Sequence, residues 1–94
     1  MYFTWDKKKA ITNLKKHGVS FEEAKTCFFD TLHIVISDHE HSNESEERLI
    51  LLGLSSENRM LVVVHIEYEN NSTIRIISAR KASKKERKQY EEIP

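Results

Sequence analysis

Apolar residues recur with helical spacing near the start of the chain. This spacing predicts a helix over about 7–17, where Asp6 can cap the first turn and Gly18 can end the last in a left-handed conformation. The apolar positions on one face of this helix are Ala10, Ile11 and Leu14. We expect that face to pack on the rest of the protein.

A second helix is predicted directly after the first. Ser20 and Glu23 have the spacing of a capping box, in which a serine accepts from a backbone N–H three residues on. The stripe of apolar residues that follows comprises Phe21, Ala24, Cys27 and Phe28. The helix is expected to end near Phe29.

The remaining chain favours strands. Short, largely β-branched stretches separated by polar turns predict strands over 2–5, 32–38, 48–54, 59–68 and 73–81. Turns are expected at 55–58 and 69–72, and Asn58 tolerates a left-handed backbone. A capping box from Ser83 to Glu86 opens a last helix that ends near Glu92. The order β-α-α-β-β-β-β-α predicts an α+β fold, a small antiparallel sheet with helices on one face.

The length, the apolar runs and the cysteine content indicate the number of domains and the cellular compartment. With 94 residues the chain is expected to form one domain, residues 1–94. No apolar run approaches the ~18 residues of a membrane span, and the N-terminus lacks the layout of a signal peptide. The single cysteine, Cys27, forms no internal disulfide. These features favour a cytoplasmic protein.

Charge is distributed unevenly along the chain, although the formal net charge is zero. Acidic residues concentrate in 38–47, whereas Lys and Arg concentrate in 7–16 and in 75–88. A polyanion responds to local clusters, so these basic segments remain candidates for binding nucleic acid.

Arginines on strands are the first candidates for a site. Arg48 and Arg59 begin neighbouring strands and are expected to converge with Arg80. The planar fork of a guanidinium group suits phosphate oxygens. Regular alternation in 73–81 would place Ile74, Ile76, Ser78 and Arg80 on one face and Arg75, Ile77, Ala79 and Lys81 on the other. The alternative is that these arginines form ion pairs with Glu46, Glu47 or Glu67.

Histidines offer a second kind of chemistry. His65 lies in an apolar strand and is either a general acid or base or a packed, hydrogen-bonded core residue. His17 lies at the end of the first helix, where it is expected to interact favourably with the helix dipole and not to have a functional role. The segment Asp38-His39-Glu40-His41 lacks a clear distant ligand, so no metal or other cofactor is expected.

The stretches 3–24, 46–55, 59–67 and 75–91 resemble the BrnT-like toxins of bacterial type II toxin–antitoxin systems, in particular KHGVSFEEA after the first helix and RIISARKASKKERKQYE at the end. The resemblance implies a compact ribonuclease related in fold to RelE-type toxins. It also implies a cognate antitoxin, expected to be of ribbon-helix-helix type, which alone contacts operator DNA. The sequence departs from the family at Asn58, where glycine is common, and in a longer acidic turn near 67–71.

The function predicted from the resemblance is metal-independent endonucleolytic cleavage of RNA, which inhibits growth. We expect Arg48, Arg59 and Arg80 to stabilise charge on the phosphate, with Glu47 or His65 as general base or acid. The residues expected to position RNA are Arg75, Lys81, Lys84, Lys85 and Tyr90. One alternative is a non-catalytic module that only binds the antitoxin, and a weaker one is direct DNA binding.

Overall fold

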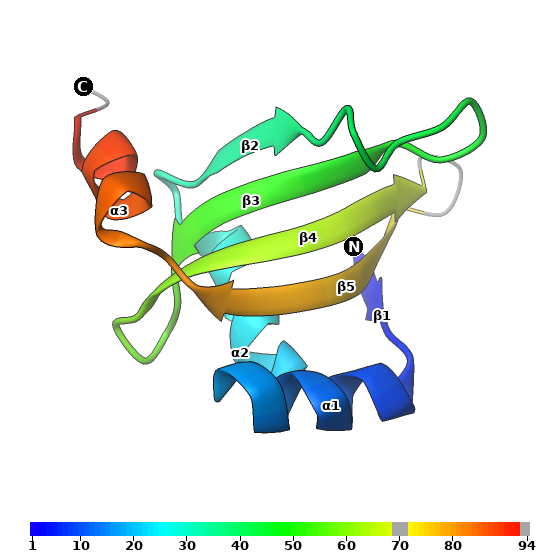
Figure 1. The fold of residues 1–94 in the computed structure, drawn as a ribbon, viewed down its shortest axis with the longest axis horizontal. Helices are drawn as coiled ribbons and strands as arrows, with labels where there is room; N and C mark the ends of the chain where they lie inside the picture. The colour runs from blue at the N-terminus through cyan, green and yellow to red at the C-terminus, as the bar shows by residue number, and fades with distance from the viewer. Residues whose placement is uncertain (69–71, 93–94) are drawn as a thin grey trace.

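The computed structural model describes residues 1–68 and 72–92. These residues form one five-stranded sheet and three α-helices (Figure 1). The elements are β1 (Tyr2–Thr4), α1 (Lys7–His17), α2 (Phe21–Thr26), the 3-10 turn η1 (Cys27–Phe29), β2 (Ile34–Ser37), β3 (Arg48–Leu54), β4 (Met60–Tyr68), β5 (Thr73–Lys81) and α3 (Lys84–Glu91). The predicted order is confirmed. The second helix differs, because its last turn tightens into η1. The predicted turn at 69–72 falls largely outside the described residues.

The sheet has the strand order β1-β5-β4-β3-β2. Strands β2 to β5 form the predicted antiparallel meander, with Leu51 opposite Val63 and Val63 opposite Ala79. Strand β1 instead pairs with β5 in parallel, Phe3 opposite Ile74, so the sheet is mixed. The expectation of a wholly antiparallel sheet was wrong for this edge strand. The chain passes from β1 at one edge through α1 and α2 to β2 at the other edge, so no hairpin turn joins β1 to β5 and requires them to be antiparallel.

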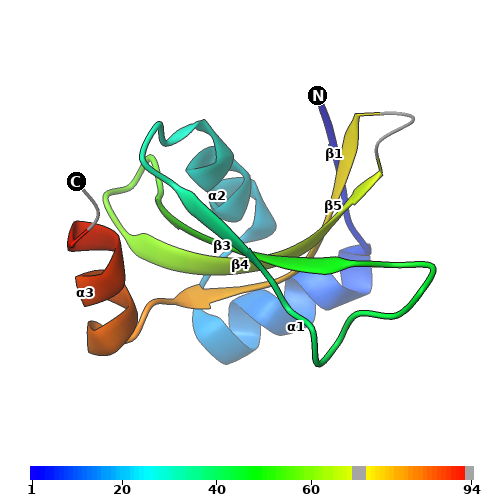
Figure 2. The same cartoon turned by 90° about the horizontal axis from the view of Figure 1, so that it is seen from above.

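The core lies between the sheet and the two N-terminal helices. Helix α2 stands behind the sheet in Figure 1, and α1 runs along the side of β5 (Figure 2). The hydrophobic residues of the buried core cluster come from both layers and comprise Val19, Phe21, Ala24, Cys27, Leu51, Leu61, Val63, Ile74, Ile76 and Ala79. Most of the predicted stripe of the second helix is therefore in the core, where its burial drives folding.

Helix α1 packs through only part of the face that its apolar spacing predicts, namely Ala10, which lies partly buried against the core. Ile11 and Leu14 are 58% and 50% exposed, whereas Asn13 is buried. The Asn13 carboxamide donates to the backbone oxygens of Val19 and Ala79 and accepts from the Ala79 N–H. Because β1 pairs only with residues 73–75, the rest of the outer edge of β5 has no neighbouring strand in the part of the chain that the structure describes, and Asn13 satisfies part of that edge.

Helix α3 stands apart from the other two. Ser83 and Glu86 form the predicted capping box, yet none of the helical residues is buried. Its side chains Glu86 and Gln89 line a shallow groove with apolar residues of the sheet face that α2 leaves open, namely Ile34, Ile36, Ile50, Leu52 and Val62. The expectation that all helices share one face was therefore wrong for α3. Within the described residues no helix is long and apolar enough to cross a membrane.

Replacing Asn13 by alanine should destabilise the protein strongly. The variant leaves the buried N–H and C=O of Ala79 without their side-chain partners, and each unsatisfied group costs about 1–3 kcal/mol. We expect the free energy of unfolding in urea to fall by about 2–4 kcal/mol. The control Thr12→Ala removes an exposed hydroxyl from the same helix and should change stability by less than about 0.5 kcal/mol. Equal losses in the two variants would contradict this role for Asn13.

Candidate nucleic-acid interface

The three arginines expected to converge lie in different places. Arg48 starts β3 opposite Ile66, whereas Arg59 precedes the other end of β4, where Met60 pairs with Leu54. Arg48 and Arg59 are thus separated by the length of the β3–β4 hairpin. Arg80 pairs with Val62, near the Arg59 end. A single pocket formed by all three arginines is therefore ruled out by the register of the hairpin.

A bulge in β5 changes which residues share a face. His65 pairs with Ile76 and Val64 with Ser78, so Ile77 is an extra residue without a partner in β4. Ala79 consequently joins Ile76 in the core. Arg75 and Arg80 both fall on the open face, where regular alternation had separated them.

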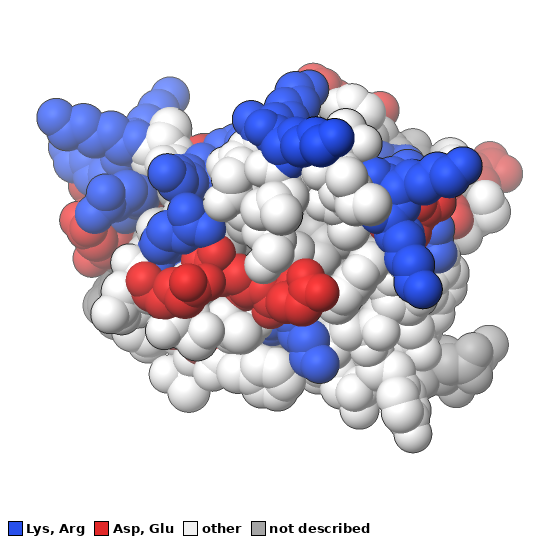
Figure 3. All heavy atoms as spheres, turned by 90° about the horizontal axis from the view of Figure 1, so that it is seen from below, with Lys and Arg blue, Asp and Glu red and all other residues white. Residues whose placement is uncertain are grey.

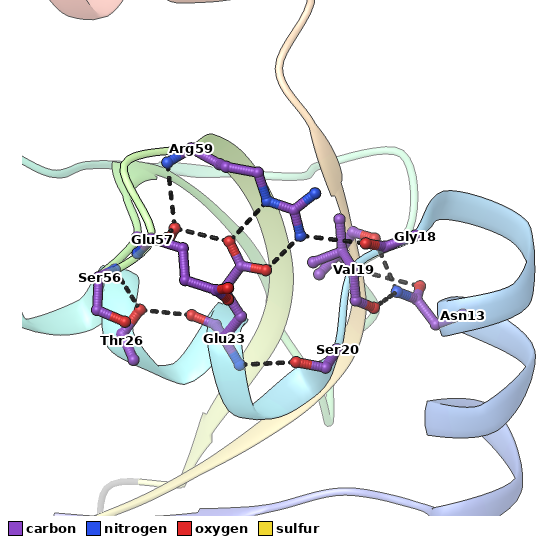
Figure 4. A network of polar contacts seen from close by, with 11 residues as sticks. Asn13, Gly18, Val19, Ser20, Glu23, Thr26, Ser56, Glu57 and Arg59 are labelled. Atoms are coloured by element: carbon purple, nitrogen blue, oxygen red, sulfur yellow. Dashed lines mark hydrogen bonds and ion pairs between the residues drawn. The ribbon is translucent and has the colours of Figure 1, made fainter.

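Arg59 is held by a buried carboxylate. Its Nε donates to Oε2 of Glu23 at 2.9 Å, while its Nη2 donates to Oε1 of Glu23 and to the carbonyl of Gly18 (Figure 4). Ser55 also donates to Glu23, over 2.7 Å. The hydrogen bonds from Arg59 hold the pKa of Glu23 below its ordinary value despite the burial of the carboxylate.

Local backbone chemistry brings these groups together. Ser20 caps α2 by accepting from the Glu23 N–H, and Gly18 ends α1 with a φ of 69° that turns the chain toward Arg59. Asn58 precedes Arg59 in the β3–β4 turn with a φ of 61°, so the predicted left-handed residue is confirmed. The Glu23 carboxylate binds Arg59 instead of completing the capping box predicted with Ser20.

Arg80 forms a second fork with a carboxylate. Its Nη1 and Nη2 donate to the two oxygens of Glu86 at 2.8 and 2.9 Å. The Ser83 N–H donates to the same carboxylate as part of the capping box. These contacts, led by the hydrogen bond from Arg80, lower the pKa of Glu86 to about 2. Arg80 is thus tied to the first turn of α3.

Uncompensated positive charge gathers at the end of the sheet beside α3. One hollow of about 290 Å³ is lined by cations from the β3–β4 turn, the end of β5 and α3, namely Arg59, Lys81 and Arg87. A second hollow shares Ala82 and Arg87 with the first and adds Lys84, Lys88 and Glu91. We call the two together the basic groove. Of its five cations, only Arg59 forms an ion pair with a carboxylate among the described residues.

Other lysines lie along α1, apart from the groove. Lys7, Lys8, Lys9, Lys15 and Lys16 are exposed. Viewed from the α1 side, Lys and Arg form separate groups, with a band of acidic side chains beside them (Figure 3). The positive surface is therefore interrupted, and the basic groove is the place where cations share a concavity.

Both predicted acid–base residues lie away from the groove. His65 is 1% exposed, packs edge-on against Phe28 and places Nδ1 3.2 Å from the carbonyl of Val63. Burial lowers the pKa of His65, so it is a neutral core residue, and the acid–base interpretation is not supported by its position. Glu47 is exposed and accepts from Ser37, next to Arg48 at the far end of β3.

Of the residues predicted to position RNA, some lie at the basic groove and others lie away from it. Lys81 and Lys84 line the basic groove, and Lys85 is exposed beside them on α3. Arg75 lies near Asp6, whose pKa it helps to lower after the backbone N–H groups of the first turn of α1. Tyr90 donates to Oδ2 of Asp30 at 2.7 Å, which raises the pKa of Tyr90 to about 12. Tyr90 therefore anchors α3 to the segment after η1.

Three residues of the site, Glu23, Arg87 and Lys88, were not among those predicted to act on RNA, although both cations lie in the basic segment 75–88. Arg87 lies three residues after Lys84, on the same side of α3, and that spacing was a usable signal. Glu23 gave no such signal, because its partner is 36 residues away.

At the acidic segment, His41 contacts Asp38, but the described residues contain no group of three His, Cys, Asp or Glu side chains suited to a metal.

The chain resembles known proteins over most of its length. Residues 5–86 match the family described as ribonuclease toxin, BrnT, of type II toxin–antitoxin systems. The crystal structure of the ribonuclease toxin BrnT from Brucella abortus covers 89% of this chain and 99% of its own, with a TM-score of 0.66 and 23% identity. At that identity the likeness establishes the fold alone. No curated protein matches the sequence.

Titration of Glu86 tests the Arg80 fork. We expect NMR of the Glu86 carboxyl carbon to give a pKa of about 2, and Arg80→Ala to move that pKa up toward the ordinary 4.5. Because the folded pKa lies below the unfolded one, the pair stabilises the protein above pH 4.5, and this contribution is lost as the pH falls toward 2. Lys85→Ala removes a neighbouring charge without touching the fork and should leave the pKa of Glu86 unchanged. An unaltered pKa in Arg80→Ala would count against the fork.

Proposed function

Because the chain belongs to the BrnT family of ribonuclease toxins of type II toxin–antitoxin systems, we propose that it cleaves RNA in the basic groove. Family membership makes the protein a ribonuclease toxin with an antitoxin as its partner. The place of cleavage rests on one observation. Arg59, Lys81 and Arg87, from three separate elements, line the same hollow beside α3.

The charge of this hollow suits a phosphodiester. Lys81 and Arg87 have no carboxylate partner among the described residues, so an RNA phosphate that enters replaces solvent and not an internal ion pair. The adjoining hollow, lined by Lys84, Arg87, Lys88 and one carboxylate, Glu91, extends the positive surface along α3. We place the scissile phosphate in the first hollow and a neighbouring phosphate in the second. Counter-ion release then favours binding at low salt.

The chemistry that fits these residues uses the ribose 2′-hydroxyl as nucleophile, without a metal ion. The 2′-oxygen forms a bond to phosphorus while the bond from phosphorus to the 5′-oxygen breaks. The products are a 2′,3′-cyclic phosphate and a 5′-hydroxyl. The cations stabilise the extra negative charge of the phosphorane, which is the largest contribution expected in such a site.

Proton transfer in this scheme does not use His65 or Glu47. His65 has no access to substrate, and Glu47 lies at the other end of β3. Glu91 lines the second hollow and not the first, where we place the scissile phosphate. Glu23 and Glu86 have lowered pKa values and are engaged with arginines, so they are weak bases. We propose that solvent accepts the 2′ proton and supplies the proton of the 5′-oxygen. Catalysis then comes mainly from electrostatic stabilisation and orientation.

The biological setting follows from the same family. We propose that the protein acts in the cytoplasm, where its RNA substrate is found. We further propose that its antitoxin is a ribbon-helix-helix protein encoded beside the toxin, and that operator DNA is contacted only through that antitoxin. Arg48 and Arg75, on the open face of the sheet, would contact RNA only where a longer strand crosses that face.

Single alanine variants test the groove. Lys81→Ala and Arg87→Ala should each lower kcat/KM for a short RNA by about 10²-fold, because each removes a cation next to developing charge. Lys15→Ala removes one charge from an exposed position on α1 and should leave cleavage within about twofold of the wild type. Full activity in both groove variants would show that RNA is cut elsewhere.

A second measurement tests the nucleophile. We expect purified protein to cleave RNA at the same rate in buffer and in excess EDTA. A substrate with a single 2′-deoxyribose at the cleaved position should be resistant at that position. Mass spectrometry of the products should find the 2′,3′-cyclic phosphate. Cleavage that stops with EDTA and returns with magnesium, or that persists through the deoxyribose, contradicts this mechanism. Absence of cleavage by folded protein would favour a module that only binds its antitoxin.

A further inference from the structure

A buried carboxylate, Glu23, orients Arg59 in the first hollow. Glu23 is 5% exposed and is satisfied entirely by neighbouring groups, with Arg59 on both of its oxygens and Ser55 on Oε2. A buried carboxylate without such partners would be strongly unfavourable, so Arg59 has one favoured position.

The side-chain nitrogens of Arg59 point in different directions. Nε and Nη2 face Glu23 and Gly18, and no hydrogen bond among the described residues uses Nη1. In Figure 4 the remaining guanidinium nitrogen points away from Glu23. The Arg59 side chain remains 32% exposed and lines the hollow with Lys81 and Arg87. The fork thus fixes a planar donor at the wall of the groove.

The pair contributes orientation more than charge. Glu23 cancels the charge of Arg59, so attraction of RNA to the hollow comes chiefly from Lys81 and Arg87. A free arginine would sample many rotamers, and restricting them before substrate binds lowers the entropy cost of reaching the transition state. A fixed donor helps most when it meets the charge that develops on the phosphate oxygens.

We propose that Glu23 is a positioning residue for RNA cleavage, which holds Arg59 so that Nη1 meets the scissile phosphate in the first hollow. This role rests on the proposed site in the basic groove. It predicts that loss of the Glu23 charge lowers kcat and leaves KM nearly unchanged. Substrate affinity does not fall, because removing a negative charge beside the groove does not weaken its attraction for RNA.

The test is a double-mutant cycle on the folded protein. Glu23→Gln and Arg59→Ala should each lower kcat by about 10²-fold, since both lose the oriented donor. In the Arg59→Ala background, Glu23→Gln should change kcat by no more than about twofold. The control Glu22→Gln removes the same charge from the exposed neighbouring position on α2 and should have no effect on kcat.

Different outcomes identify which statement fails. If Arg59→Ala, Lys81→Ala and Arg87→Ala all keep full activity, the proposed site itself is wrong. If Arg59→Ala is impaired while Glu23→Gln is not, the positioning role alone is overturned. A loss from Glu23→Gln that is equally large in both backgrounds also overturns it, because that is the effect of a general structural defect.

A variant that leaves the buried residue intact covers the case in which Glu23→Gln does not fold. Arg59→Lys keeps the positive charge opposite Glu23 but cannot form a fork with it. We expect Arg59→Lys to fold, to bind RNA with a similar KM and to lose kcat by about 10-fold or more. Wild-type kcat in Arg59→Lys would show that a fixed guanidinium is not required, and would overturn the proposal.

Discussion

The fork between Glu23 and Arg59 joins three parts of the chain that are distant in sequence. It connects the start of α2 with the β3–β4 turn, and through Nη2 it reaches the carbonyl of Gly18 at the end of α1. Thr26 strengthens the same connection, because its hydroxyl accepts from the Ser56 N–H (Figure 4). The helical layer and the turn that carries the groove are therefore fixed to each other by polar contacts as well as by the core.

Neutral overall charge is compatible with a nucleic-acid site because the charges are sorted by position. Glu23 and Glu86 each neutralise one arginine at the groove end, whereas Lys81 and Arg87 remain without carboxylates among the described residues. The forks orient the two arginines, whereas no carboxylate among the described residues holds the remaining cations. The combination gives an anion site both defined geometry and net charge.

The sequence predicts those parts of the fold that depend on local chemistry. Caps at Asp6 and Ser83 and left-handed residues at Gly18 and Asn58 lie where expected, since each involves only the next few residues. The strand and helix order followed from periodicity. Periodicity did not predict that Asn13 and not Leu14 is the buried residue of α1, because this depends on a strand edge 66 residues away.

The candidate site was predicted in composition but not in arrangement. Arg59, Arg80, Lys81 and Lys84 do lie near one end of the sheet, while Arg48, Glu47 and His65 do not share it. The bulge at Ile77 shifts the face of every later residue of β5, and nothing in the local sequence marks it. Register and bulges arise from pairing between strands, so they require three-dimensional information.

The polar attachment of α3 has a consequence for the groove as a whole. With no buried side chain, this helix is held by the Arg80 fork at its start and by the Tyr90 contact near its end. Such an element opens by local unfolding at a much lower free energy than the whole domain. The cations of α3 are then in place only while the helix is docked. Any ligand that binds the docked helix shifts this equilibrium, so occupancy and assembly of the groove are thermodynamically linked.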